Sequence, residues 1–210
     1  MTLYSYIVKH DTGFSPNPFF GYCTLACCKN VIRRKAQKDH GDWVVGLTPK
    51  ADGNRIVFFM RVDDVKEFDE YWGDARFKQK KPRYDAAVAL KCGDNAYEPK
   101  PSGGGYRQLP CVHSDGKREN AENKEHDLSG RKVLISERFA YFGSEARELP
   151  LELKPLIVGR GHRCRFSDKV KDAFLCFAGS IRSGVYAAPR KWPTGDDSWK
   201  LAADPWLIKR

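Results

Sequence analysis

The chain has 210 residues, of which 41% are hydrophobic and 12% aromatic, which suits one folded domain and excludes a disordered protein. No apolar stretch approaches the length of a membrane-spanning helix and the first residues lack a signal-peptide pattern, so we expect a cytoplasmic protein with reduced cysteines. The net charge of +10 favours anionic partners.

The first sixty residues predict strands, one helix and a hairpin turn. Residues 3–10 combine aromatic and β-branched side chains, which is typical of a strand. A loop with two prolines follows, and Thr24 is expected to cap a helix that runs to about residue 37. Residues 41–47 and 55–62 should be strands, joined by a turn at Asp52-Gly53.

The middle of the chain mixes short elements with one long irregular segment. Residues 63–77 predict a short helix, and residues 86–93 a strand or a helix. Residues 98–130 are rich in Gly, Pro, Asn and charge, so we expect either an interdomain linker or a long functional loop there. Residues 131–143 return to strand character, and residues 144–157 predict helical turns broken by two prolines.

The last part predicts one helix and a tail. Residues 167–181 have the spacing of an amphipathic helix, with four core-facing residues: Val170, Phe174, Leu175 and Phe177. From residue 186 the chain should be irregular and held to the body by three tryptophans: Trp192, Trp199 and Trp206. The predicted fold class is α+β, with a small mixed, barrel-like sheet, flanking helices and long loops in a single domain over residues 1–210.

Two clusters of basic residues have no acidic residue within them. The first lies in residues 29–38 and contains Lys29, Arg33, Arg34, Lys35 and Lys38. The second lies in residues 159–165 and contains Arg160, Arg163 and Arg165. Each alone is explained by a solvated basic face, but together with the many aromatic residues they favour a nucleotide or nucleic acid as partner.

Several blocks of the sequence resemble the second family of nucleotide-modification-associated domains. The blocks are "DTGFSPNPFF" from Asp11, "CTLACCK" from Cys23, "GDW" from Gly41, "EYWGDARF", "CGDNAYEP", "VLISERFAYFG" and "GRGHR". The chain departs from the family pattern at Asn30, where proline is expected, and in "KDH", which lengthens the approach to Gly41. The resemblance implies a role in systems that make or handle modified bases. The order of elements is more loosely similar to PUA-like barrels, which include readers of modified bases.

A pocket for a base is predicted within the stretch from His10 to Lys29. Pro16 and Pro18 stiffen the loop, and Asn17 offers a donor and an acceptor that can read a base edge. Aromatic rings there offer stacking faces, each worth about 1–3 kcal/mol per base. The predicted base-binding residues are Asn17, Phe19, Phe20, Tyr22, Thr24 and Trp43. The alternative is that these rings are core and that Asn17 caps a turn.

A phosphate site is predicted at "GRGHR" together with the first basic cluster. Two glycines let a ligand approach the backbone, and arginines donate forked hydrogen bonds to phosphate. The predicted phosphate-binding residues are Lys29, Arg33, Arg34, Arg160, Gly161, His162 and Arg163. The alternative is a surface turn with a solvated histidine.

The cysteines allow two kinds of chemistry. Cys23, Cys27, Cys28, Cys92, Cys111 and His113 contain enough donors for zinc, but no C-x-x-C pair is present, so we expect no metal and no cofactor. Cys28 could instead act as a nucleophile with His162 or His113 as its base. A buried, unreactive thiol is the alternative.

The function predicted from the sequence is a binding module that recognises a modified base in DNA or RNA, or a modified nucleotide. The alternative is a base- or nucleotide-modifying enzyme in which Cys28, His162, Asp11 or Asp94 carries the chemistry. The chain lacks the P-loop, the G-x-G-x-x-G element and the deaminase zinc signature. A protein-interaction domain with a basic face is a third alternative, and the sequence leaves the oligomeric state open.

Overall fold

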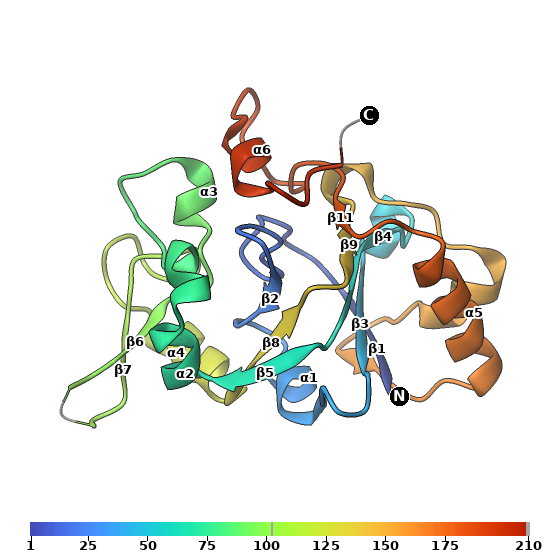
Figure 1. Cartoon of the computed structure of the whole chain (residues 1–210), viewed down its shortest axis with the longest axis horizontal. Helices are drawn as coiled ribbons and strands as arrows, with labels where there is room; N and C mark the ends of the chain where they lie inside the picture. The colour runs from blue at the N-terminus through green and yellow to red at the C-terminus, as the bar shows by residue number, and fades with distance from the viewer. Residues whose placement is uncertain (102, 209–210) are drawn as a thin grey trace.

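The computed structural model describes residues 1–101 and 103–208, which form three β-sheets surrounded by short helices (Figure 1). The largest sheet has the strand order β10-β1-β3-β4-β9-β11. Its strands are β1 (Leu3–Ile7), β3 (Trp43–Leu47), β4 (Ile56–Arg61), β9 (Phe139–Tyr141), β10 (His162–Arg163) and β11 (Gly184–Val185). The sheet is mixed, because β1 runs parallel to β3 whereas β3 and β4 are antiparallel. Among the described residues it stays open, so the predicted barrel-like closure is not observed.

Two smaller sheets complete the β-structure. One has the order β2-β8-β5 and consists of β2 (Cys23–Leu25), β8 (Lys132–Ser136) and β5 (Asp64–Glu67). The other is the hairpin of β6 (Tyr97–Pro99) and β7 (Tyr106–Gln108). In Figure 1 the three-stranded sheet lies between the large sheet and a lobe formed by that hairpin and three helices, α2, α3 and α4.

The helices are short and cover the outside of the sheets. They are α1 (Asn30–Lys35), α2 (Phe68–Gly73), α3 (Val88–Lys91), α4 (Ala121–Leu128), α5 (Asp168–Gly179) and α6 (Ser198–Ala202). Four 3₁₀ turns add η1 (Lys50–Asp52), η2 (Ala75–Lys80), η3 (Gly143–Glu145) and η4 (Leu151–Leu156). Among the described residues, no helix has the length and apolar character needed to cross a membrane.

The large sheet is buried on both faces. Along β3, Val44 faces one hydrophobic cluster and Val45 the other, as the two-residue period of a strand requires. α5 covers the second face, where Phe174 lies 5.4 Å from the ring of Trp43. Val170 and Phe174 are buried as predicted, but Leu175 is 40% exposed because it points away from the sheet.

The predicted helix from Thr24 is wrong at its start. Cys23–Leu25 is the strand β2, in which Thr24 pairs with Ile135 of β8. The helix begins only at Asn30, after Cys28 and Lys29, which both have positive φ. Pairing with a buried strand therefore overrides the local helical pattern.

The stretch 98–130, predicted as a loop, contains β7 and α4. The tail from residue 186 contains the short α6, and its three tryptophans pack against the first hydrophobic cluster, as predicted. Phe20 N donates to the carbonyl of Ala202 at 2.7 Å, so α6 also supports the proline-containing loop.

Buried polar groups fix the loop of residues 11–22. Lys80 Nζ is fully buried and donates to Asn17 O at 3.1 Å, Asn17 Oδ1 at 2.7 Å and Tyr22 O at 2.9 Å. Asp11 accepts from the hydroxyl of Tyr141 and, at 3.0 Å, from the backbone N–H of Arg190. Since such groups are costly to bury without partners, they define the path of the loop.

Candidate active site

Cys28 lies in a left-handed backbone conformation between β2 and α1. Its φ is 55° and that of Lys29 is 38°, values that non-glycine residues seldom adopt. The backbone N–H of Cys28 donates to Asp127 Oδ1 at 2.6 Å, and its carbonyl accepts from Arg33 Nε at 2.8 Å. Side chains thus bond both the backbone N–H and the backbone carbonyl of Cys28, which stabilises its left-handed conformation.

Three side chains form a chain of contacts from this cysteine. The sulfur of Cys28 lies 3.5 Å from Nε2 of His113, and Nδ1 of His113 lies 2.7 Å from Oδ2 of Asp127. The hydroxyl of Tyr97 donates to the same carboxylate oxygen at 2.7 Å. A thiol, an imidazole and a buried carboxylate in this order make the arrangement of a nucleophile, its base and the group that orients the base.

The electrostatics favour a charged histidine at neutral pH. Burial acts to lower the pKa of His113, but the hydrogen bonds and charges of Asp127 and Cys28 outweigh it and raise this pKa to about 10. Burial acts to raise the pKa of Asp127, but its bond to His113 and the charge of His113 lower it overall. The sulfur of Cys28 therefore lies beside an imidazolium.

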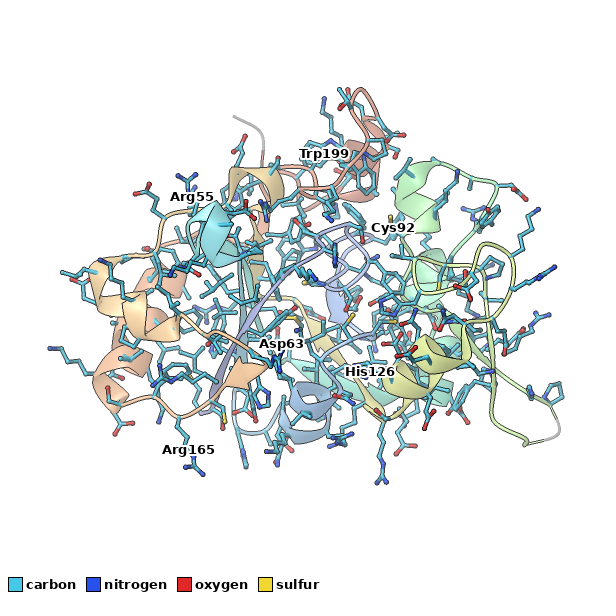
Figure 2. The ribbon with its side chains drawn as sticks, turned by 180° about the vertical axis from the view of Figure 1, so that it is seen from behind. Arg55, Asp63, Cys92, His126, Arg165 and Trp199 are labelled. Carbon is cyan, nitrogen blue, oxygen red and sulfur yellow. The ribbon has the colours of Figure 1, made fainter. Side chains whose placement is uncertain are left out.

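The thiol opens into a pocket of about 440 Å³ that lies between β1, β10, α1 and the end of α4. Cys28 and His113 both line the pocket, as do Lys29, Gly161 and His162. Figure 2 shows His126, another lining residue, on α4 at the side nearer to α1 in that view. The volume lies within the range of small-molecule sites.

Among the predicted phosphate-binding residues, Lys29, Gly161 and His162 line the pocket. Arg33 does not, since it is fully buried and donates to the carbonyls of Cys28, Lys132 and Asp127. The predicted contact of Arg33 with a phosphate is therefore wrong, because its guanidinium is buried and bonds to the backbone. Arg34, Arg160 and Arg163 are exposed outside the pocket lining, and Arg163 donates to Pro155 O at 3.2 Å.

The predicted base-binding residues lie largely in the core. Asn17 and Phe19 are 0% exposed, and Asn17 uses its amide within the protein, with Nδ2 donating to Cys92 O at 2.8 Å. Thr24 is also buried, and its hydroxyl donates to Asp94 at 2.7 Å. Trp43 packs between Phe59 and Phe174 on the large sheet. These four side chains are therefore part of the core and do not line the pocket.

Phe20 and Tyr22 are half-buried and lie outside the pocket lining. Phe20 packs against the first hydrophobic cluster, and the ring of Tyr22 lies 5.2 Å from that of Phe77. The wall of the pocket does come from the same loop, but from other positions, including His10, Thr12, Phe14 and Ser15. The stretch from His10 to Lys29 therefore contributes to the pocket through residues near its two ends.

Of the four residues considered for chemistry, Cys28 and His162 line the pocket. Asp11 and Asp94 are buried away from it, where Asp94 accepts from Tyr71 at 2.7 Å and from Thr24. His113, the second base considered for Cys28, is the histidine in contact with its sulfur. Asp127 was not predicted, because it lies in the stretch that was expected to be a loop.

Cys27, His113 and Asp127 could also be considered as metal ligands. Their donor atoms lie within 4.8 Å of one another. However, Oδ1 of Asp127 already accepts from the backbone of Cys28, and Oδ2 accepts from Tyr97 and contacts His113. The guanidinium of Arg33 adjoins the same residue. The arrangement is thus satisfied without an ion and fits acid–base chemistry better than coordination.

A family model described as nucleotide modification associated domain 2 matches residues 1–196. It thus covers the strands of the large sheet, Cys28, His113 and Asp127. No curated protein and no solved structure matches the chain.

Proposed function

The chain belongs to the nucleotide modification associated domain 2 family, and from this membership we propose that it is an enzyme that modifies a nucleotide or its base through a covalent bond to Cys28. One observation carries the proposal: the sulfur of Cys28 lies 3.5 Å from Nε2 of His113, which contacts Asp127 at 2.7 Å, and thiol and imidazole both face the pocket.

The proposed chemistry is substitution at an electrophilic carbon of the base or of its substituent. The thiolate of Cys28 forms a carbon–sulfur bond, and the leaving group departs with its bonding electrons and takes the Nε2 proton of His113. Water, or an acceptor with a free amine or hydroxyl, then attacks the same carbon and gives its proton to His113. The carbon–sulfur bond breaks, and the thiolate is restored. Asp127 holds the imidazole in place throughout.

The alternative function is recognition of a modified base without chemistry. The pocket has a suitable size, but the aromatic residues expected to stack on a base are mostly core. Recognition alone does not require a thiol in contact with an imidazole, whereas a nucleophile and its base do. We therefore favour the enzyme.

The test uses intact-protein mass spectrometry with a panel of plain and modified nucleotides and oligonucleotides. We expect one substrate to give either turnover or an adduct on Cys28, and Cys28→Ser to abolish both. Cys176→Ser is the matched control, because Cys176 is an exposed thiol outside the pocket. Selective binding by Cys28→Ser and by the unchanged protein alike, with no product from either, would identify a reader and overturn the proposal.

A further inference from the structure

The pocket that contains Cys28 is lined by basic residues. Lys9 and Lys29 contribute to it, as do four of the five histidines of the chain: His10, His113, His126 and His162. No Asp or Glu is present among its described lining residues. A solvated protein surface normally mixes both signs of charge, so this pocket concentrates positive potential.

The cation nearest to the nucleophile in sequence has no acidic partner. Lys29 follows Cys28 directly, and its Nζ lies 4.6 Å from the centre of the Tyr6 ring. None of the ion pairs among the described residues involves Lys29. Tyr6 pairs with His162 across β1 and β10, which places His162 on the same wall of the pocket.

Neighbouring lysines act on the protonation of two of these histidines. Burial, then the charges of Lys35 and Lys29, lower the pKa of His162. Burial, then the charges of Lys191 and Lys9, lower the pKa of His10, another lining residue. A bound anion would offset the effect of these lysine charges at both histidines.

We infer that the substrate of the Cys28 site carries a phosphate group, and that Lys29 and His162 hold this phosphate while the base or its substituent reaches the sulfur. The inference rests on the proposed function of Cys28 and adds the substrate class: a nucleotide, in contrast to a nucleoside or a free base. A phosphate supplies the double charge and the several acceptor oxygens that an ammonium and an imidazole on one wall can share.

The experiment compares alkylation of Cys28 by anionic iodoacetate and by neutral iodoacetamide at low salt. We divide the rate with iodoacetate by the rate with iodoacetamide. We expect this ratio to be roughly tenfold higher at Cys28 than at the exposed Cys176 of the same molecule. Lys29→Gln should bring this ratio close to that of Cys176. Lys50→Gln, an exposed lysine outside the pocket lining, is the matched control and should leave the ratio unchanged.

A second measurement uses the unchanged protein and asks which ligand protects Cys28 from iodoacetamide. Inorganic phosphate and each of the four 5′-deoxynucleoside monophosphates should slow the reaction, whereas the matching nucleosides should not. Stronger protection by a single-stranded oligonucleotide than by the monophosphates would assign the phosphate to a nucleic acid, and the reverse to a free nucleotide.

Equal ratios at Cys28 and Cys176, or equal protection by nucleosides and nucleotides, would overturn the phosphate inference. Failure of the proposed function has a different signature, namely no adduct and no turnover for any substrate in the panel.

Discussion

His113 lies between a buried carboxylate and a thiol, and each neighbour stabilises its protonated form. The contacts of 2.7 Å to Asp127 and 3.5 Å to Cys28 link the charge of the imidazole to the reactivity of the sulfur. The reactivity of Cys28 in a variant of His113, and the pH dependence of stability that His113 causes, therefore test the site directly.

Substitution of His113 should slow the reaction of Cys28 with a neutral reagent. We expect His113→Gln to lower the rate of iodoacetamide alkylation at pH 7 by about tenfold, because the substitution removes the charged imidazole that lies 3.5 Å from the sulfur. His40→Gln is the matched control, since His40 is exposed and is the one histidine outside the pocket lining. Mass spectrometry of the Cys28 peptide measures the rate. An unchanged rate in His113→Gln would contradict the proposed roles of Cys28, His113 and Asp127.

His113 also predicts how stability depends on pH. Its pKa in the folded protein is about 10, above the ordinary value of 6.5, so the folded state binds this proton more tightly than the unfolded state. The resulting stabilisation is complete below pH 6.5 and is lost as the pH rises through 10. Asp127 has the opposite dependence on pH. Because its pKa is lowered in the folded protein, its contribution to the free energy of unfolding is present above about pH 4 and is lost in acid.

Urea unfolding of the protein and of His113→Gln at pH 6, 8 and 10 measures this effect. The difference in free energy of unfolding should be largest at pH 6 and smallest at pH 10. A difference that stays constant over this range would mean that folding does not raise the pKa of His113.

At the residue level, the sequence predicted part of the site. Cys28 and His162 were identified from residue type and neighbours, and His113 as an alternative base. The sequence cannot show that residues 28, 113 and 127 meet, because their contact depends on how α4 and β8 fold back onto β2. The assignment of Arg33 to phosphate was wrong because a basic pattern does not distinguish an exposed guanidinium from a buried one.

Among the elements, α1 carries Arg33, which donates a hydrogen bond to the carbonyl of Cys28, the proposed nucleophile. Arg33 crosses from α1 to the segment after α4, where a Cβ on Gly130 would lie 2.2 Å from its guanidinium carbon. Glycine at position 130 therefore leaves the space that Arg33 fills. The position of the Cys28 carbonyl depends on this packing.

Gly130→Ala should displace Arg33 and disturb Cys28. We expect a loss of about 1–3 kcal/mol in the free energy of unfolding, as overpacking in a core typically costs, together with slower alkylation of Cys28. Gly73→Ala is the matched control, because a Cβ there meets nothing within 4 Å. Chemical unfolding and alkylation rates measure both effects; equal stability of the two variants would contradict the role given to Arg33.

Long periodic elements were the most predictable ones. The strands around Val45 and Phe58 and the amphipathic α5 follow their hydrophobic periods, and the structure confirms them. The start of α1 was mispredicted because pairing of Thr24 with β8 depends on a strand more than one hundred residues away. α4 was missed because its sequence, "AENKEHDL", has almost no apolar period.

At the scale of the whole molecule, the C-terminal segment supports the N-terminal loop. Nε1 of Trp206 donates to the carbonyl of Gly21 at 2.7 Å, and its ring lies 5.6 Å from that of Phe139. Trp192 similarly lies 5.6 Å from Phe19. The C-terminal segment thus holds in place a loop whose first half lines the pocket.

Trp206→Ala should destabilise the protein through this contact. Full truncation of a buried tryptophan costs about 3–5 kcal/mol, and since Trp206 is only half-buried we expect about 2 kcal/mol. Trp72→Ala, another half-buried tryptophan, is the matched control, because Trp72 is not among the residues packed against the clusters. Thermal unfolding measures both; a larger effect for Trp72→Ala would contradict the supporting role of the tail.

The distance along the chain between the two sides of the Cys28 site has a consequence for biosynthesis. The sulfur meets a histidine 85 positions later, and its backbone N–H meets a carboxylate 99 positions later. While the ribosome has made only the first hundred residues, the thiol is an ordinary one without partners. The site of the proposed nucleophile is therefore complete only after translation of α4, and shorter nascent chains lack the contacts on which the proposed chemistry depends.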